Sequence, residues 1–311
     1  MTAQVGDRPR VAALVVNYDT AQLTAQLVFS LMRVLEPGAL TRIVVVDNSP
    51  REDATGVLSG LHEAGIVTLL RNRARPYHGP GLNRGLSFLA EQQRLQADLD
   101  LVWVLDSDVI VLRREALSTA IESLRRAQAG LAGQVRTPYP LHWPQGHVNG
   151  VGEDTSMIWQ PHWQPPTPPA GPAIGPHPLY WPYLHISSLL LDPTVMWQPD
   201  VPPFQEDGEP GIAMQAAMHR QGLRAVDVPV FRDELLLHLG RGTSFAVRDA
   251  RRWRNRYYRW SRFETAHHYE GNRRGPERYA AFWEAFTRDV PVPEARGLID
   301  ACRRPERLVF A

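Results

Sequence analysis

Two aspartates separated by a single residue follow a short apolar run in the segment LVWVLDSD. The run Leu101–Leu105 has the length and composition of a buried strand, and Asp106 and Asp108 come directly after it. Ligands of open parallel sheets bind outside the carboxyl ends of the strands, where two carboxylates suit a hard divalent cation that also binds phosphate. The alternative is a solvated turn in which Asp108 caps a helix. A second Asp-x-Asp pair precedes the strand, at the wrong end for a ligand.

Polar side chains also follow two earlier apolar runs. Asn17 comes after the run Val11–Val16, and Asp47 comes after Ile43–Val46. Each residue alone is typical of a turn or a helix cap. Because polar groups at consecutive strand ends share one edge of a parallel sheet, together they favour a ligand crevice.

Three further segments could contribute to such a crevice. Glu206, Asp207 and Glu209 form an acidic cluster before a predicted helix; they could supply a general base, or simply favour the helix dipole. His238 follows an apolar run and could complete a metal site, or be an ordinary packed histidine. The glycine-rich segment 78–85 opens a predicted helix, whose amino terminus would attract anions. Its glycine spacing and its distance from the preceding strand do not fit a dinucleotide-binding fingerprint.

Alternating strands and helices must position these residues. Short apolar runs predict buried strands, leucines at helical spacing from Leu23 to Leu35 predict the first helix, and the rhythm predicts an α/β fold with a doubly wound sheet. The predicted strands are Val11–Val16, Ile43–Val46, Ile66–Leu70, Leu101–Leu105 and Ala225–Phe231, and the later predicted helices are Gly81–Gln96, Arg114–Ala127 and Gly211–Gln221. Leu184–Leu191 is predicted to be regular structure of unspecified type.

A proline- and tryptophan-rich segment interrupts this rhythm at residues 138–182. Its prolines exclude a central strand, and its length is typical of a binding loop, a lid or a disordered segment. The interleaved tryptophans, which include Trp159 and Trp181, favour a packed loop. The residues from 245 to 311 are predicted to be helical, and the stretch 246–262 carries an arginine stripe beside an apolar one.

Composition excludes several classes of function. The 34 basic and 33 acidic residues of this 311-residue chain nearly balance, and every basic residue is arginine, which excludes a Schiff-base lysine and a P-loop lysine. Cys302 is the only cysteine, so an internal disulfide and a cysteine-built zinc cluster are excluded. No apolar run is long enough for a membrane helix, and the amino terminus lacks a signal-peptide pattern. We therefore predict a soluble, cytoplasmic protein.

The order of these segments resembles the family 2 glycosyltransferases, which have the GT-A fold. The similarity extends over roughly residues 10 to 262. The matching pieces are VVNYDTAQLTAQLVFSLM, IVVVDNSP, the stretch from Asn72 through HGPGLNRGL, LVWVLDSD, HISSLLLDPTVM, FQEDGEPGIAMQAAMHRQGLRAVDVP and LHLGRGTS. The resemblance implies a mostly parallel sheet flanked by helices in a catalytic domain at 1–244. It also implies a nucleotide-sugar half at about 10–112, an acceptor half at about 113–244, and a helical extension at 245–311.

The resemblance also implies roles for individual residues. Asp207 is the general base, with Glu206 and Glu209 as rivals. Asp108 ligates Mn²⁺ or Mg²⁺ on the donor diphosphate, with His238 as a further ligand, while Asp106 binds the ribose or the metal. The donor side comprises Asn17, Asp47 on the nucleotide base, Asn83 and Arg84. The acceptor side comprises His185 and Ser187. The proline- and tryptophan-rich segment departs from the family pattern, and Trp159 and Trp181 are expected on the acceptor side for a different reason, because aromatic faces suit sugar rings.

The implied reaction is metal-dependent and inverting. One sugar passes from a UDP-, dTDP- or GDP-linked donor to a hydroxyl acceptor such as a small molecule, a natural product or a cell-envelope glycan. A nucleotidyltransferase and a non-catalytic module that binds anionic ligands remain alternatives. For the arginine-rich stretch 246–262 the alternatives are a docked helix, peripheral contact with an anionic membrane, or packing in a homodimer. No nucleic-acid partner is expected.

Overall fold

The structure is a computed structural model, and it describes residues 8–50, 56–73, 77–96, 99–136, 183–205, 210–231, 233–238 and 302–303. The proline- and tryptophan-rich segment 138–182, Glu206, Asp207 and the predicted helical extension, apart from Cys302 and Arg303, lie outside these ranges. The predictions made for them, including those for Trp159, Trp181 and the stretch 246–262, stay predictions.

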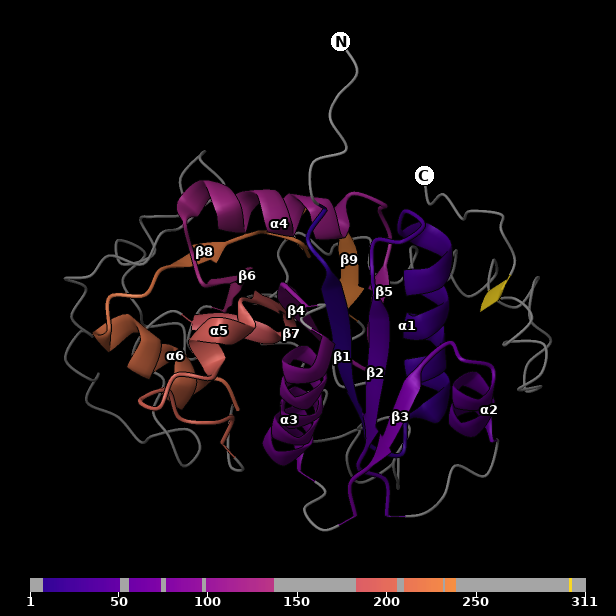
Figure 1. Ribbon diagram of the computed structural model, residues 1–311. Coiled ribbons are helices and arrows are strands. Elements are labelled where there is room, and N and C mark those ends of the chain that lie inside the picture. The colour runs from indigo at the N-terminus through magenta and orange to yellow at the C-terminus, as the bar shows by residue number, and fades with distance from the viewer. Residues whose placement is uncertain are drawn as a thin grey trace, which may run out of the picture.

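A seven-stranded sheet forms the centre of the protein, with strand order β3-β2-β1-β4-β7-β6-β8 (Figure 1). Every strand runs parallel to the others except β7, which is antiparallel to both of its neighbours. This arrangement confirms the predicted mostly parallel α/β sheet. The strands are β1 (Val11–Asn17), β2 (Arg42–Asp47), β3 (Thr68–Arg71), β4 (Leu101–Asp106), β6 (Leu131–Arg136), β7 (Tyr183–Leu191) and β8 (Ala225–Asp227).

Helices cover both faces of the sheet, and a hydrophobic core fills the space on each side. In β1, Val11, Ala13 and Val15 belong to one core and Ala12, Leu14 and Val16 to the other, as expected for a strand buried on both faces. The first core includes side chains of α1 (Ala21–Val34), α2 (Val57–Glu63) and α4 (Ala116–Ala127). The second includes side chains of α3 (His78–Gln96), α5 (Pro193–Met196) and α6 (Ile212–Arg220).

A separate two-stranded ribbon lies beside the main sheet. It pairs β5 (Val109–Val111) with β9 (Leu236–His238) in antiparallel fashion. Neither of these two short strands was predicted from the sequence. The ribbon connects the end of β4 to a segment more than a hundred residues later, and it matters for the site described below.

The glycine-rich segment at the start of α3 is helical and closely packed. The helix begins at His78, three residues before the predicted start, and a Cβ on Gly79 would lie 1.9 Å from the carbonyl oxygen of Gln205. Added Cβ atoms on Gly81 and Gly85 would also lie too close, to Asn48 and Leu14 respectively. These glycines therefore allow α3 to approach the sheet and the 204–205 segment. From the sequence alone, the glycines were interpreted as allowing the backbone to approach a phosphate group.

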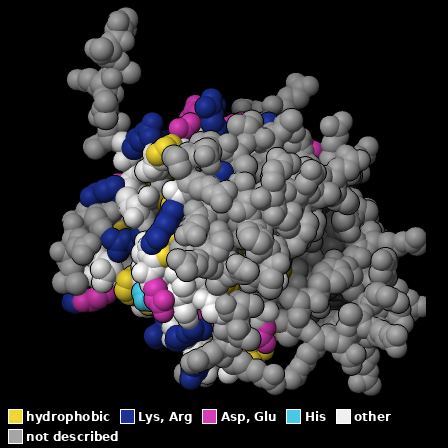
Figure 2. Space-filling view, turned by 90° about the vertical axis from the view of Figure 1, so that its right-hand side faces the viewer, with side chains coloured by type: hydrophobic (Ala, Val, Ile, Leu, Met, Phe, Trp, Pro, Cys, Tyr) yellow, Lys and Arg dark blue, Asp and Glu magenta, His cyan; other side chains and the backbone are white. Residues whose placement is uncertain are grey.

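Charges of both signs are interspersed on the surface. On the face in Figure 2, arginines and acidic side chains of the described residues lie among one another. None of the helices in the ranges given above is both long enough and apolar enough to span a lipid bilayer.

Candidate active site

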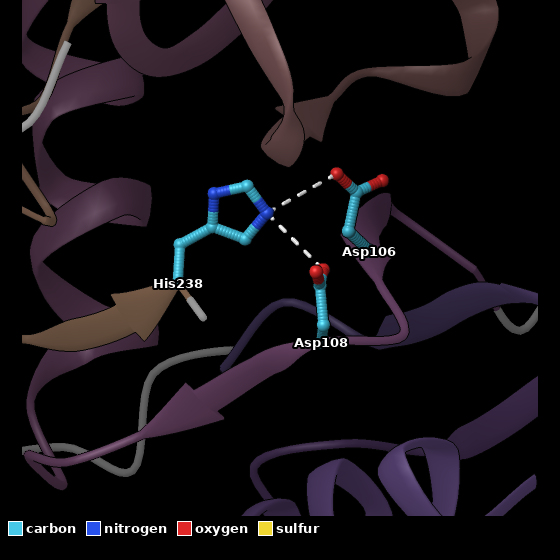
Figure 3. A group of neighbouring side chains, drawn as sticks. All are labelled: Asp106, Asp108 and His238. Carbon is cyan, nitrogen blue, oxygen red and sulfur yellow. Dashed lines mark hydrogen bonds and ion pairs between the residues drawn. The ribbon is translucent and has the colours of Figure 1, made fainter. Parts of the chain in front are cut away.

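Asp106, Asp108 and His238 converge beside the carboxyl end of β4 (Figure 3). The Nε2 atom of His238 lies 3.1 Å from Oδ1 of Asp108 and 3.6 Å from Oδ2 of Asp106. One ligand atom from each residue fits within 4.8 Å of the other two, and among the described residues no second group of three histidine, cysteine or acidic side chains is this close. Two carboxylates and an imidazole are a donor set that binds Mn²⁺ or Mg²⁺, so the residues fit the predicted cation.

The local sequence explains how the three side chains meet. Asp106 is the last residue of β4, Ser107 and Asp108 form the turn, and β5 begins directly after Asp108. In the ribbon, Val109 lies opposite His238, which places the imidazole above the two carboxylates although His238 is 130 residues from Asp108. Asp108 is 5% exposed and is followed by a strand, so it is neither in a solvated turn nor the cap of a helix. This excludes the alternative left open by the sequence.

His78 joins this group from the first turn of α3. Its Nε2 atom lies 3.5 Å from Oδ1 of Asp106, and about a third of its side chain is exposed. Sequence reasoning considered the glycines of this segment and gave His78 no role. The signal that could have identified it is its position at the start of a helix expected to face the strand ends.

Two aromatic rings lie close to the His238 imidazole. The ring centroid of His185 lies 5.8 Å from that of His238, and the centroid of Phe231 lies 5.6 Å away. His185 is a β7 residue whose Nδ1 atom is bonded to the hydroxyl of Ser187. Ser187 is fully buried, whereas His185 is partly exposed. Of these two predicted acceptor-side residues, His185 therefore offers surface to a ligand.

Asn17 and Asp47 are brought together, as expected for neighbouring strand ends. Asn17 donates to Asp47 through its amide (2.8 Å), and Ser49 donates to the same carboxylate through its hydroxyl (2.6 Å). Asn17 in turn accepts hydrogen bonds from Thr20 and Thr24. Both Asn17 and Asp47 are 1% exposed, so this polar network is enclosed and organises the sheet edge beneath the site.

Asn83 and Arg84 lie side by side on α3 but have different surroundings. The Asn83 amide is bonded to the backbone of Phe204 through both its oxygen and its nitrogen. Arg84 is exposed. Phe204 and Gln205 directly precede Glu206 and Asp207, so α3 contacts the chain just before the predicted general base.

The second Asp-x-Asp pair has a different environment. Asp100 lies at the opposite end of β4, where its carboxylate accepts hydrogen bonds from the backbone and the guanidinium of Arg10. The side-chain hydrogen bond from Arg10 holds the pKa of Asp100 below its usual value of 3.8. From the sequence, the choice between the two Asp-x-Asp pairs rested on their position relative to the strand. In the structure, the pair after the strand belongs to the candidate metal cluster, and Asp100, before the strand, forms a surface ion pair.

No protein-family model matches the chain, and no curated protein matches its sequence. Its structure is similar to that of the mannosyltransferase PcManGT from Pyrobaculum calidifontis in complex with GDP-Man and Mn²⁺, at 19% identity and a TM-score of 0.48, over 72% of this chain and 56% of that one. It is also similar to S. aureus TarS in complex with UDP-GlcNAc, at 14% identity and a TM-score of 0.46, over 70% of this chain and 56% of that one. The chain thus spans a little over half the length of the structures it matches.

Proposed function

We propose that the protein is a metal-dependent, inverting glycosyltransferase that moves one sugar from a nucleotide-activated donor to a hydroxyl group of an acceptor. The observation that carries the proposal is the convergence of Asp106, Asp108 and His238 at the carboxyl end of a parallel strand. This is where open α/β sheets bind their ligands, and the donor set suits a hard cation that also binds phosphate oxygens.

Asp108, Asp106 and His238 would hold the cation. When bound there, it supplies positive charge opposite the diphosphate that leaves with the nucleoside. Asp108 and His238 are nearly enclosed, with side chains 6% and 7% exposed, whereas that of Asp106 is 19% exposed. Asp106 is therefore the group best placed to face the donor.

Asp207 takes the proton of the acceptor hydroxyl in this proposal, with Glu206 and Glu209 as the rival bases. The acceptor oxygen forms a bond to the anomeric carbon while the bond from that carbon to the diphosphate oxygen breaks. The electron pair of the broken bond leaves with the nucleoside diphosphate. Attack from the face opposite the leaving group inverts the configuration, and a positioned general base contributes about a hundred- to ten-thousand-fold to such a step.

We place the donor nucleotide over the edge formed by Asn17, Asp47 and Arg84, and the acceptor near His185 and Ser187. Trp159 and Trp181 form part of the acceptor wall in this proposal, since aromatic faces suit sugar rings and other flat groups. Replacing either tryptophan by alanine should then raise the acceptor KM more than the donor KM. Equal effects on both constants would count against this assignment.

The test is a thermal-shift screen of nucleoside diphosphates with and without Mn²⁺, followed by product analysis with the matching nucleotide sugars. We expect one base to stabilise the protein only when the cation is present, and the assay to release the nucleoside diphosphate. Asp108→Asn should abolish the cation-dependent shift. Asp100→Asn is the matched control, because it changes the same residue type at the other end of β4 and should leave the shift intact.

Two outcomes would overturn the proposal. Release of pyrophosphate would show attack at phosphorus and hence a nucleotidyltransferase. If the wild type bound nucleotides but transferred no sugar, and Asp207→Asn changed nothing measurable, a non-catalytic module that binds anionic ligands would be favoured.

A further inference from the structure

The side chain of Asn83 makes a two-bond contact with the backbone of Phe204. Its Nδ2 atom donates to the Phe204 carbonyl at 2.7 Å, and its Oδ1 atom accepts from the Phe204 amide at 2.9 Å. The two residues are 121 positions apart, and Phe204 is 2% exposed. Since these bonds use both polar ends of the carboxamide, the contact fixes the Phe204 backbone against α3.

The neighbouring residues tighten the same contact. Gly79, one helical turn before Asn83, touches the backbone of Gln205 so closely that any side chain there would collide with it. The amide of Gln205 donates to the carbonyl of Pro210 at 3.0 Å, which ties together the two ends of the acidic segment 206–209. Phe204 and Gln205, which precede this segment, are therefore held against the helix that also carries His78, beside Asp106.

A second contact of the same chemistry holds the chain after the acidic segment. Gln215, on α6, donates through Nε2 to the carbonyl of Leu184 and accepts through Oε1 from the amide of Leu184, both at 2.8 Å. Gln215 is fully buried, and Leu184 lies on β7 next to His185. The helix that follows the acidic residues is thus fixed to the strand that carries a predicted acceptor-side residue.

We propose that Asn83 and Gln215 are positioning residues that hold the chain on either side of the acidic segment, at 204–205 and 210–215, at a fixed place relative to Asp106, Asp108 and His238. The inference rests on the proposed function, in which this segment supplies the general base. It assigns Asn83 to the base side of the site, whereas the sequence resemblance placed it near the donor. The chemical reason is that a general base acts only within hydrogen-bond reach of the proton it removes, and a misplacement of about 1 Å costs roughly a hundredfold in rate.

The test replaces each amide by leucine, which is similar in size and cannot bond to the backbone. In Asn83→Leu and Gln215→Leu we expect kcat to fall by about a hundredfold. The dissociation constant of the nucleoside diphosphate with Mn²⁺ should stay within about twofold of the wild-type value, because the metal ligands and the donor edge are untouched. Gln93→Leu is the matched control, since it removes a side-chain amide bond to the backbone of Leu99 from the far end of the same helix.

Hydrogen exchange provides a readout that needs no activity. The amides of residues 204–205 and 210–213 should exchange faster in Asn83→Leu and Gln215→Leu than in the wild type, and should not change in Gln93→Leu. If Asn83→Leu does not fold, Asn83→Ser removes the same contact with a smaller side chain and is read in the same way.

The possible results separate the two hypotheses. If the wild type transfers no sugar, the proposed function fails, and exchange at 204–205 alone decides whether Asn83 and Gln215 position the segment. Nucleotide affinity that falls in proportion to kcat in Asn83→Leu would make Asn83 a donor contact and overturn the inference. Unchanged exchange in both leucine variants would overturn it as well.

Discussion

Asp47 and Arg71 face each other at the ends of neighbouring strands, and the guanidinium of Arg71 is bonded to the Asp47 carboxylate. The carboxylate is 1% exposed and also accepts hydrogen bonds from Asn17 and Ser49. Because Arg71 reaches the hydroxyl of Ser59 as well, the pair links β2, β3 and α2 at the edge of the sheet nearest the site. An acid expected to bind the nucleotide base thus has a clear structural partner.

We therefore expect Asp47→Ala to destabilise the fold. The substitution leaves the buried amide of Asn17 and part of the Arg71 guanidinium without their acceptor, and each such loss costs about 1–3 kcal/mol. Urea unfolding should show a loss of roughly 2–4 kcal/mol in the free energy of unfolding. Asp192→Ala, which removes an exposed cap of α5, is the control and should cost about 1 kcal/mol. Unaltered stability with strongly weakened nucleotide binding would instead assign Asp47 to the donor directly.

The two histidines nearest Asp106 should have separable effects. His238→Ala removes one of the three candidate ligands and should weaken Mn²⁺ binding by at least about tenfold. His78→Ala should reduce sugar transfer while leaving Mn²⁺ affinity nearly unchanged, because His78 contacts only Asp106 among the three ligand residues. Isothermal titration with Mn²⁺ alone measures the first effect. Equal losses of Mn²⁺ affinity in both variants would mean that His78 is itself a ligand.

Most of the sheet could be predicted from the sequence because its strands are continuous apolar runs. The runs at β1, β2 and β4 are buried on both faces, and this burial produces the pattern that sequence reasoning detects. The strands β5 and β9 are only three residues long, and their pairing depends on a contact between distant segments, which no local pattern encodes. The position of Asp106 and Asp108 at the end of a strand could be predicted from the sequence. The position of His78 near Asp106 depends on how closely α3 packs against the sheet, which the sequence does not show.

The ion pair at the other end of β4 predicts a pH dependence of stability. Arg10 lowers the pKa of Asp100 in the folded state, so the folded protein favours the ionised carboxylate. The stabilisation is fully present above the ordinary value of 3.8 and is lost as the pH falls through the lower pKa of the folded state. We expect Asp100→Asn to be slightly less stable than the wild type at neutral pH, because the pair is largely exposed. In acid titrations followed by circular dichroism, the difference should disappear at low pH; a difference that grows there would contradict the assignment.

Cys302 should be unreactive in the folded protein. Its thiol is 2% exposed within the core that packs on α1, and burial raises its pKa to about 12, with the charge of Arg33 acting weakly in the opposite direction. Ellman's reagent should therefore label the native protein far more slowly than the unfolded chain at about pH 8. Since the unfolded thiol ionises near 9.0, the stability advantage of the wild type over Cys302→Ala should shrink as the pH rises above that value. Rapid labelling of the native protein would show that this segment does not stay in the core.

The amide contacts that flank the acidic segment could not have been predicted from the sequence. Nothing in the sequence distinguishes Asn83 and Gln215 from other polar helix residues. Their partners are backbone groups, which every residue has, so residue type does not identify them. Asn83 was singled out only through the family resemblance, which suggested proximity to the donor. The helix packing that decides the matter depends on Gly79, whose lack of a side chain admits the neighbouring backbone.

Because β5 pairs with β9, the ligand cluster is built from two stretches of chain that are far apart in the sequence. Asp106 and Asp108 belong to one stretch and His238 to the other, and the short ribbon of three residue pairs joins the two. A cation that bridges them binds the paired ribbon more tightly than the separated strands, so by thermodynamic linkage its occupancy and the docking of β9 reinforce each other. The bound ion would then stabilise the docking of β9, the last described strand, at the end of the central sheet.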